Sequence, residues 1–199
     1  LITDVILLNI KSIGIYAFSS CESITYLKFG SALSKIYQYS FSGCKNLKIV
    51  DGFENTVITD TSWNTFYGCS SLQSIQLPES LTTIGGSAFY GCTSLQSIQL
   101  PESLTTIGSS AFNGCTSLVV ITLPASLTNI YRQAFSGCSS LQYIRIEATI
   151  PPTLASTNAI PTTRGAIYVP DASVAVYQAA TNWSSFASKI KGISEMPAE

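Results

Sequence analysis

The sequence predicts a β-rich solenoid in which six coils of about 23 residues stack on one another and form a parallel sheet along one face. Three observations predict this fold. The six Cys recur at intervals of 23, 25, 23, 23 and 23 residues, each Cys has a Phe three residues before it, and five of these Phe have an Ile five residues further upstream. A single repeat of this length cannot bury its apolar side chains alone, so the repeats are expected to stack.

Each coil is expected to contain a strand, a second short extended piece and a helical turn. The strand around Ile75 and Leu77 alternates apolar and polar residues, and Pro78 ends it. Residues 81–84 predict the short extended piece, and residues 87–92 predict a single helical turn that ends at a Gly. Equivalent strands are expected around Ile98/Leu100, Ile121/Leu123 and Ile144/Ile146.

The aligned copies resemble the BspA-like class of bacterial leucine-rich repeats. One copy shows the residues that carry the resemblance: Ala88, Phe89, Gly91, Cys92, Leu95, Ile98, Leu100, Pro101, Leu104 and Ile107. The match spans residues 8–150 and implies a leucine-rich-repeat solenoid. Residues 52–65 depart from the pattern, with two extra residues and with Phe53, Val57 and Trp63 in place of the usual sequence. That coil is expected to bulge and to offer an edge for a ligand.

The two ends differ from the repeat. Residues 1–150 are expected to form the solenoid, and residues 151–199 a small α+β cap that covers the apolar side chains and the strand edge of the last coil. Within the cap, 165–170 predicts a strand, and a helix is expected from Asp171 or Ser173 through Ala180, with Asn182 capping the next helical segment. This tail resembles the one that follows such repeats in surface proteins of anaerobic bacteria. Because the chain begins with Leu1 rather than Met, an upstream segment such as a secretory signal is expected to have been removed.

Composition argues against two classes of partner. The net charge is −1 and the ten Lys and Arg are scattered, so no basic stripe for nucleic acid is expected. No apolar run reaches the roughly 18 residues that a membrane span needs, so membrane insertion is not expected.

The residues that could support catalysis are few. The chain has no His, which removes the commonest general base and most zinc sites. The six Cys lack metal-ligand spacing and are expected to be buried free thiols, so we predict no catalytic residue, no metal and no cofactor. An alternative uses Glu79 and Glu102, one repeat apart and hence about 5 Å apart at the backbone, which is close to the carboxylate separation of retaining glycosidases.

The outward side chains of the sheet are the predicted ligand-binding residues, because successive strands align them in columns on one surface. These residues are Tyr26, Lys28, Asp51, Gln76, Gln99, Thr122, Tyr143 and Arg145. Tyr143 and Arg145 are the first candidates, since both residue types anchor interfaces. Tyr67 and Tyr90 are expected to stack one repeat apart on the helical-turn side. The alternatives are that the sheet face is only solvated, with its aromatic residues supporting cross-strand packing, and that the tyrosine pair only covers the core.

The resemblance implies a non-catalytic binding and adhesion module outside the cell or on its surface, with a protein or a glycan as its ligand. A structural spacer within a larger surface protein and a carbohydrate-active enzyme are the alternatives. The sequence leaves the oligomeric state open.

Overall fold

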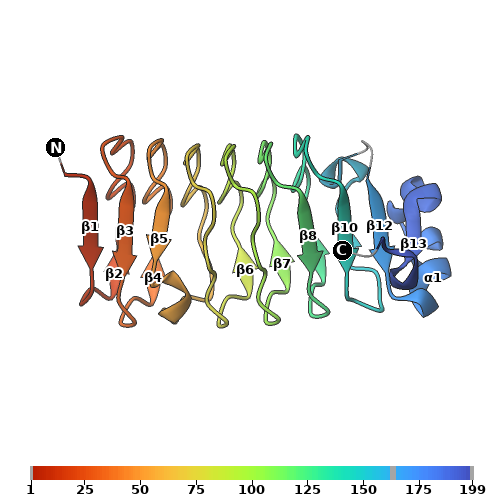
Figure 1. Ribbon diagram of the computed structural model, residues 1–199. Helices are drawn as coiled ribbons and strands as arrows, with labels where there is room; N and C mark the ends of the chain where they lie inside the picture. The colour runs from red at the N-terminus through yellow and green to blue at the C-terminus, as the bar shows by residue number, and fades with distance from the viewer. Residues whose placement is uncertain (1, 162–164, 198–199) are drawn as a thin grey trace.

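The computed structural model describes residues 2–161 and 165–197, in which coils stack along one axis to form a leucine-rich-repeat solenoid with a small C-terminal cap (Figure 1). Each coil contributes to three sides. The long-strand face carries β1 (Asp4–Leu7), β3 (Tyr26–Phe29), β5 (Ile49–Asp51), β8 (Val120–Leu123) and β10 (Tyr143–Ile146). The short-strand face carries β2 (Ser12–Ile13), β4 (Lys35–Ile36), β6 (Thr83–Ile84), β7 (Thr106–Ile107), β9 (Asn129–Ile130) and β11 (Thr153–Leu154). The turn side holds the Phe and Cys of each repeat.

All strand pairs that involve these elements are parallel, and each strand pairs with its counterpart in an adjacent coil. The strands expected around Ile121 and Ile144 are confirmed as β8 and β10. Those expected around Ile75 and Ile98 are wrong as regular strands, because those segments join only through a bridge between Gln76 and Gln99. The flanking outward residue there is Ser, whereas β3, β5, β8 and β10 have Tyr, Ile or Val, which favour extended backbone.

The turn side differs from the helical turn that the sequence predicts. The N–H groups of Ala88 and Tyr90 donate to carbonyls three residues earlier, as in a tight helical turn, but those of Phe89 and Gly91 donate to the next coil. Ser87 and Gly91 have positive φ angles (53° and 68°), and they accompany this alternation of amides that point within the turn and along the stack. The predicted helical turn is therefore wrong for every second residue. The N–H groups of those residues instead form a ladder of hydrogen bonds between coils along the turn side.

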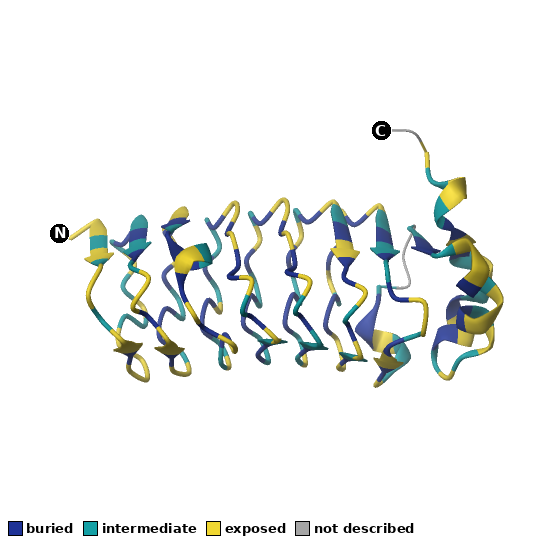
Figure 2. Ribbon diagram, turned by 90° about the horizontal axis from the view of Figure 1, so that it is seen from below, coloured by how far each residue is buried: buried dark blue, intermediate teal, exposed yellow. Residues whose placement is uncertain are grey.

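Aromatic rings form the centre of the core. The side chains of Phe41, Phe66, Phe89, Phe112 and Phe135 are fully buried, and consecutive rings stack with centroids 5.4 to 5.7 Å apart. Buried positions consequently recur at the same place in successive coils (Figure 2). Full burial of such a side chain stabilises the fold by roughly 1.5–3 kcal/mol, so the repeated Phe contributes to every coil.

The backbone completes one more turn after the repeat pattern ends. β11 pairs with β9, and the N–H of Phe135 donates to the carbonyl of Ala159 in the 3-10 helix η2 (Thr157–Ala159). The strand expected at 165–170 is confirmed as β12 (Ala166–Val169), which pairs with β10. The boundary expected at residue 150 lies inside this additional turn.

The cap continues the long-strand face and then covers the end of the stack. β13 (Ile190–Gly192) pairs with β12, and α1 (Val174–Ala179) confirms the helix expected from the sequence. Short 3-10 helices occupy Phe53–Asn55 (η1), Asp171–Ser173 (η3), Trp183–Lys189 (η4) and Ile193–Glu195 (η5). Asn182 stands at the start of η4 but makes no capping bond, because its side-chain amide donates to the carbonyl of Leu154 instead.

Three side chains of the cap bind the last coil in this way. Trp183 Nε1 and Tyr177 Oη donate to the carbonyls of Pro152 and Ala148, each at 2.8 Å, and Asn182 donates to Leu154 at 2.6 Å. In the preceding coil the carbonyls of Thr128 and Ile130, the counterparts of Pro152 and Leu154, accept backbone N–H groups of the following coil. Side-chain donors of the cap thus take the place of a following coil beside β11.

Candidate functional site

The outward residues of the long-strand face lie in register along the stack. Lys28 pairs with Asp51 in β3 and β5, and Thr122 pairs with Arg145 in β8 and β10. Between these two strand pairs, a parallel bridge joins Gln76 and Gln99 of the two middle coils. The predicted residues thus pair with their counterparts in adjacent coils at three places along the face, and their contacts differ at its two ends.

The first end of the face holds a hydrogen-bonded cluster. Tyr26 Oη donates to Asp51 Oδ2 at 2.9 Å, and Lys28 Nζ lies 2.9 Å from the same oxygen. The hydrogen bond from Lys28 is the largest cause that lowers the pKa of Asp51, and the bond to Asp51 raises the pKa of both Tyr26 and Lys28. The three side chains hold one another in place while remaining open to solvent.

Two isoleucines stand beside this cluster on the same face. Ile6 of β1 is 59% exposed, and Ile49 of β5 is 56% exposed. Ile6 pairs with Lys28, and Ile49 pairs with Tyr26. Neither Ile6 nor Ile49 was among the predicted ligand-binding residues, although alternation along the strands places both side chains outward. The end of the face is consequently a mixed apolar and charged surface.

The far end of the face is more tightly packed. The Tyr143 ring meets the edge of Tyr168, with centroids 5.6 Å apart, and Arg145 Nε lies 2.6 Å from Glu147 Oε1. Neither Tyr168 nor Glu147 was predicted as part of the surface, because β12 lies beyond the last sequence repeat. Tyr168 is nearly buried, so it acts here as a support for Tyr143.

The middle of the face is exposed and polar. Gln76, Gln99 and Thr122 are all exposed, and a shallow hollow of about 530 Å³ lies over the last two, with Glu102 at its rim. The structure brings the predicted residues into one row, but the middle ones make no cluster like that of Asp51.

The deviant coil is confirmed as a local irregularity. Its additional residues form η1, with Phe53 buried, while Val57 and Trp63 are 58% and 63% exposed. Thr61 occupies the position of the usual Ile, and its buried Oγ1 accepts a 2.9 Å hydrogen bond from the N–H of Gly85 in the next coil. A side-chain oxygen thus continues the ladder where the backbone departs from it.

The Cys ladder is a packing feature. All six thiols are free, and five of them are buried. Each buried Sγ donates to the carbonyl of the Phe in the preceding coil, at 3.1 to 3.3 Å. Burial raises the pKa of Cys44 and Cys138 to about 12, and it also raises the pKa of Cys69, Cys92 and Cys115 well above the usual value of a thiol. Thiolate chemistry is therefore suppressed at these positions.

The predicted tyrosine pair on the turn side is confirmed. The rings of Tyr67 and Tyr90 stack with centroids 4.8 Å apart. Tyr67 is 39% exposed and Tyr90 is half-buried, so the pair covers the core while leaving one ring partly open.

The acidic pair of the alternative enzyme hypothesis lies on the surface. Glu79 and Glu102 are both exposed, and Glu102 alone borders the hollow over Gln99. Within residues 2–161 and 165–197, no group of His, Cys, Asp and Glu is arranged to hold a metal ion. In the same described ranges, no helix has the length and apolarity needed to cross a bilayer.

Stacked parallel coils, a recurrent Phe and Cys ladder and an open long-strand face define a leucine-rich-repeat protein. The model of the BspA type leucine rich repeat region matches residues 2–92 and 59–156, so the chain belongs to this family. No curated protein matches the chain.

Solved structures of bacterial leucine-rich repeat proteins share the fold. The T. pallidum leucine rich repeat protein TpLRR is 26% identical, with a TM-score of 0.68 over 83% of this chain and 73% of that one. A Bacteroides ovatus leucine-rich repeat protein is 29% identical, with a TM-score of 0.65 over 84% of this chain, which spans only 48% of that protein. A leucine rich cell surface protein of Faecalibacterium prausnitzii is 20% identical, with a TM-score of 0.55 over 94% of this chain and 62% of that one.

Proposed function

We propose that this chain is a non-catalytic binding and adhesion module of a bacterial cell surface and that it recognises a protein through the long-strand face. The observation that carries the proposal is the end of that face, where exposed Ile6 and Ile49 flank the cluster of Tyr26, Lys28 and Asp51. Apolar side chains next to fixed polar groups are typical of the centre of a protein interface. The surface location is supported by the family and by the name of the F. prausnitzii protein.

The arrangement of the cluster favours recognition over chemistry. Asp51 is held by Lys28 and Tyr26, so its carboxylate is oriented before a partner arrives. Preorganised polar groups reduce the entropy lost on binding. The cluster supplies a charged oxygen, an ammonium group and a phenol edge within one small area, and the isoleucines supply apolar contact.

The experiment is binding of the purified chain to immobilised extracellular-matrix proteins, measured by surface plasmon resonance. We expect the Lys28→Ala/Ile49→Ser variant to lose about tenfold or more in affinity for the proteins that the native chain binds, as for an interface hot spot. Tyr143→Ala/Arg145→Ala tests the other end of the face.

Tyr67→Ala is the matched control, because it removes a partly exposed aromatic ring from the turn side. Native affinity in both long-strand-face variants would contradict the proposal. Absence of any bound protein would instead favour the spacer.

A further inference from the structure

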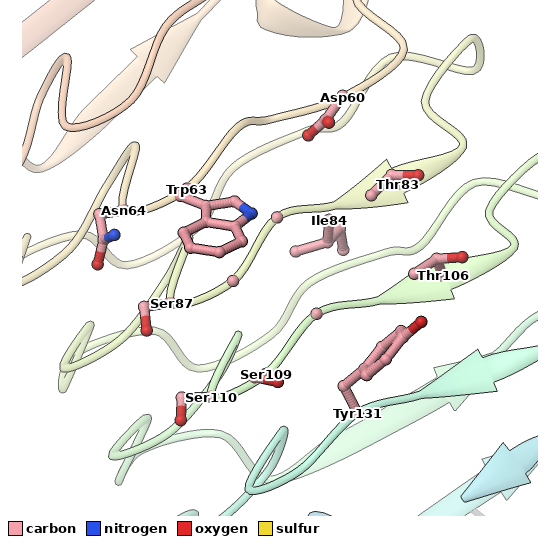
Figure 3. Close-up of a pocket in the computed structure, with 13 residues that line it drawn as sticks. Asp60, Trp63, Asn64, Thr83, Ile84, Ser87, Thr106, Ser109, Ser110 and Tyr131 are labelled. Carbon is pink, nitrogen blue, oxygen red and sulfur yellow. The ribbon is translucent and has the colours of Figure 1, made fainter. Parts of the chain in front are cut away.

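A second hollow opens where the short-strand face meets the turn side. Its volume is about 470 Å³, and none of the described residues that line it belongs to the long-strand face. Trp63 and Tyr131 lie on either side of it (Figure 3), with 63% and 46% of their surfaces exposed. They belong to coils three apart, so their backbone positions are separated by about 14 Å at the usual strand spacing. The volume is in the usual range for small-ligand sites.

The hollow lies between two large side chains, Trp63 and Tyr131, and the two coils that separate them carry small residues at the corresponding positions. In the two coils between Trp63 and Tyr131, the residues after the short strand are Gly85-Gly86 and Gly108-Ser109. The Trp63 ring lies beside Gly86, with two of its carbons 4.0 Å from the place where a Cβ would stand. Small residues thus form the bed, and the aromatic rings form the walls.

The backbone of the bed is already paired within the solenoid. The N–H of Gly85 donates to Thr61 Oγ1 at 2.9 Å, and the N–H of Gly108 donates to the carbonyl of Ile84 at 2.8 Å. An extended peptide needs an unpaired strand edge if it is to add to a sheet. This bed offers no such edge at either glycine, so the geometry disfavours peptide binding by strand addition.

Several hydroxyl groups of the bed are available for hydrogen bonds to a ligand, whereas a recurrent Ser hydroxyl elsewhere in the same coils is already paired. Elsewhere in the same coils, one Ser of each repeat donates to a carbonyl of the preceding coil at 2.7 Å: Ser80, Ser103 and Ser126. The hydroxyls of Thr83, Ser87, Ser109 and Ser110 make no side-chain hydrogen bond to any residue within the described part of the chain. They can both donate to and accept from a ligand.

The hollow carries little charge. Asp60 is the one charged residue among the described residues that line it, and its Oδ1 accepts a hydrogen bond from the N–H of Ser62 at 2.6 Å. The lining otherwise consists of hydroxyls, one amide, glycines and apolar side chains. An acidic ligand would find no counter-ion among these lining residues.

We propose that this hollow is a second binding site and that its ligand is an uncharged oligosaccharide. A sugar ring presents C–H groups on its faces, which pack against exposed aromatic rings such as Trp63 and Tyr131. Its hydroxyl groups exchange hydrogen bonds with side chains such as Thr83 and Ser109. The site differs from the proposed protein-binding surface in both its residues and its ligand, so either can fail without the other.

The test uses the whole chain on an array of neutral and acidic oligosaccharides, followed by calorimetric titration with the neutral oligosaccharide that binds best. We expect binding of neutral oligosaccharides, with a loss of about tenfold or more in affinity for Trp63→Ala and for Tyr131→Ala. The chain has two Trp, and Trp183 is buried in the cap, so saturation should also shift the fluorescence of Trp63 to shorter wavelength.

Tyr37→Ala is the matched control, because Tyr37 follows the short strand β4 as Tyr131 follows β9 but lies outside the hollow. The double variant Thr83→Val/Thr106→Val keeps the shape of the bed and removes two hydroxyls, so it should weaken binding while leaving thermal unfolding unchanged. Binding of acidic oligosaccharides alone, native affinity in the Trp63 and Tyr131 variants, or no neutral ligand at millimolar concentration would each overturn the proposal.

Discussion

A buried thiol in each of five coils combines the size of a small apolar residue with a weak hydrogen-bond donor. The S–H group of Cys92, for example, donates to the carbonyl of Phe66, which also accepts the N–H of Cys69 in its own coil. The repeated Cys therefore ties adjacent coils together without a covalent bond. Cys21 differs from the others, because it is only partly buried and its S–H group donates to no carbonyl within the described residues.

Alkylation should distinguish these thiols. The thiolate is the reactive form, so a pKa raised to about 12 by burial, as at Cys44 and Cys138, leaves almost no reactive species at pH 8. We expect iodoacetamide to modify Cys21 rapidly in the native chain and the other five Cys only slowly, as measured by peptide mass spectrometry. All six should react in the unfolded chain, and rapid labelling of Cys92 in the native state would refute the assignment.

The short strands illustrate how an element depends on the coil beside it. A Cβ at Gly108 would stand 2.6 Å from the nitrogen of Gly86 and 2.8 Å from the carbonyl carbon of Gly85. A Cβ at Gly86 would meet its nearest atom, the carbonyl oxygen of Ser109, at 3.4 Å. Gly108 therefore stands at a close approach of two backbones, whereas a Cβ at Gly86 would make only ordinary van der Waals contacts.

The two Ala substitutions should accordingly differ in stability. Gly108→Ala should lower the free energy of unfolding by roughly 1–3 kcal/mol, the usual cost of an overpacked site. Gly86→Ala should leave it unchanged or raise it by about 0.4–1 kcal/mol, because Ala restricts the unfolded chain. Urea unfolding followed by circular dichroism measures both, and equal destabilisation would show that the bed packs differently.

Elements whose residues repeat strictly were predicted correctly from the sequence, and elements that depend on variable residues were not. Phe89 and Cys92 recur with a fixed spacing, so the stack and its core followed directly. The loss of regular strand at Ser74 and Ser97 did not, because it depends on the propensity of outward residues that the core pattern ignores. The alternating amides of the turn side require positive φ at residues such as Ser87, and no side-chain pattern marks them.

The candidate sites also include features that the sequence pattern predicts and features that it does not. The row on the long-strand face was predictable, because alternation along a strand determines which side chains point outward. The support of Tyr143 by Tyr168 was not, since β12 shares no repeat residues with β10. The hollow between Trp63 and Tyr131 could have been found by aligning the residues after each short strand and looking for small ones between large ones.

At the scale of the whole molecule, stability is shared between neighbouring coils and depends on how the stack ends. The cap buries Trp183 and Tyr177, whose rings meet edge to face with centroids 5.2 Å apart. Both donate hydrogen bonds to carbonyls of the last turn. In such a quasi-one-dimensional protein, loss of an end should destabilise the adjacent coils more than distant ones.

Trp183→Ala tests this expectation. Removal of the buried ring should cost about 3–5 kcal/mol. Hydrogen exchange should rise first in residues 143–160 and least in residues 24–50. The control is Trp63→Ala, which removes an exposed ring of the same type and should leave exchange in both ranges as in the native chain. A uniform rise along the whole chain would indicate a single cooperative unit instead.

Because the coils stack regularly, the distance between Trp63 and Tyr131 is a whole number of strand spacings. Two nearly identical coils separate these rings, and each of them pairs with the coil that follows it through equivalent backbone hydrogen bonds. Duplication or deletion of one 23-residue segment between them would preserve the ladder while changing their separation by one strand spacing, about 4.8 Å. The number of coils between the two rings would then set the length of the hollow. Relatives that gain or lose such a segment would fit ligands that differ in length by about one strand spacing.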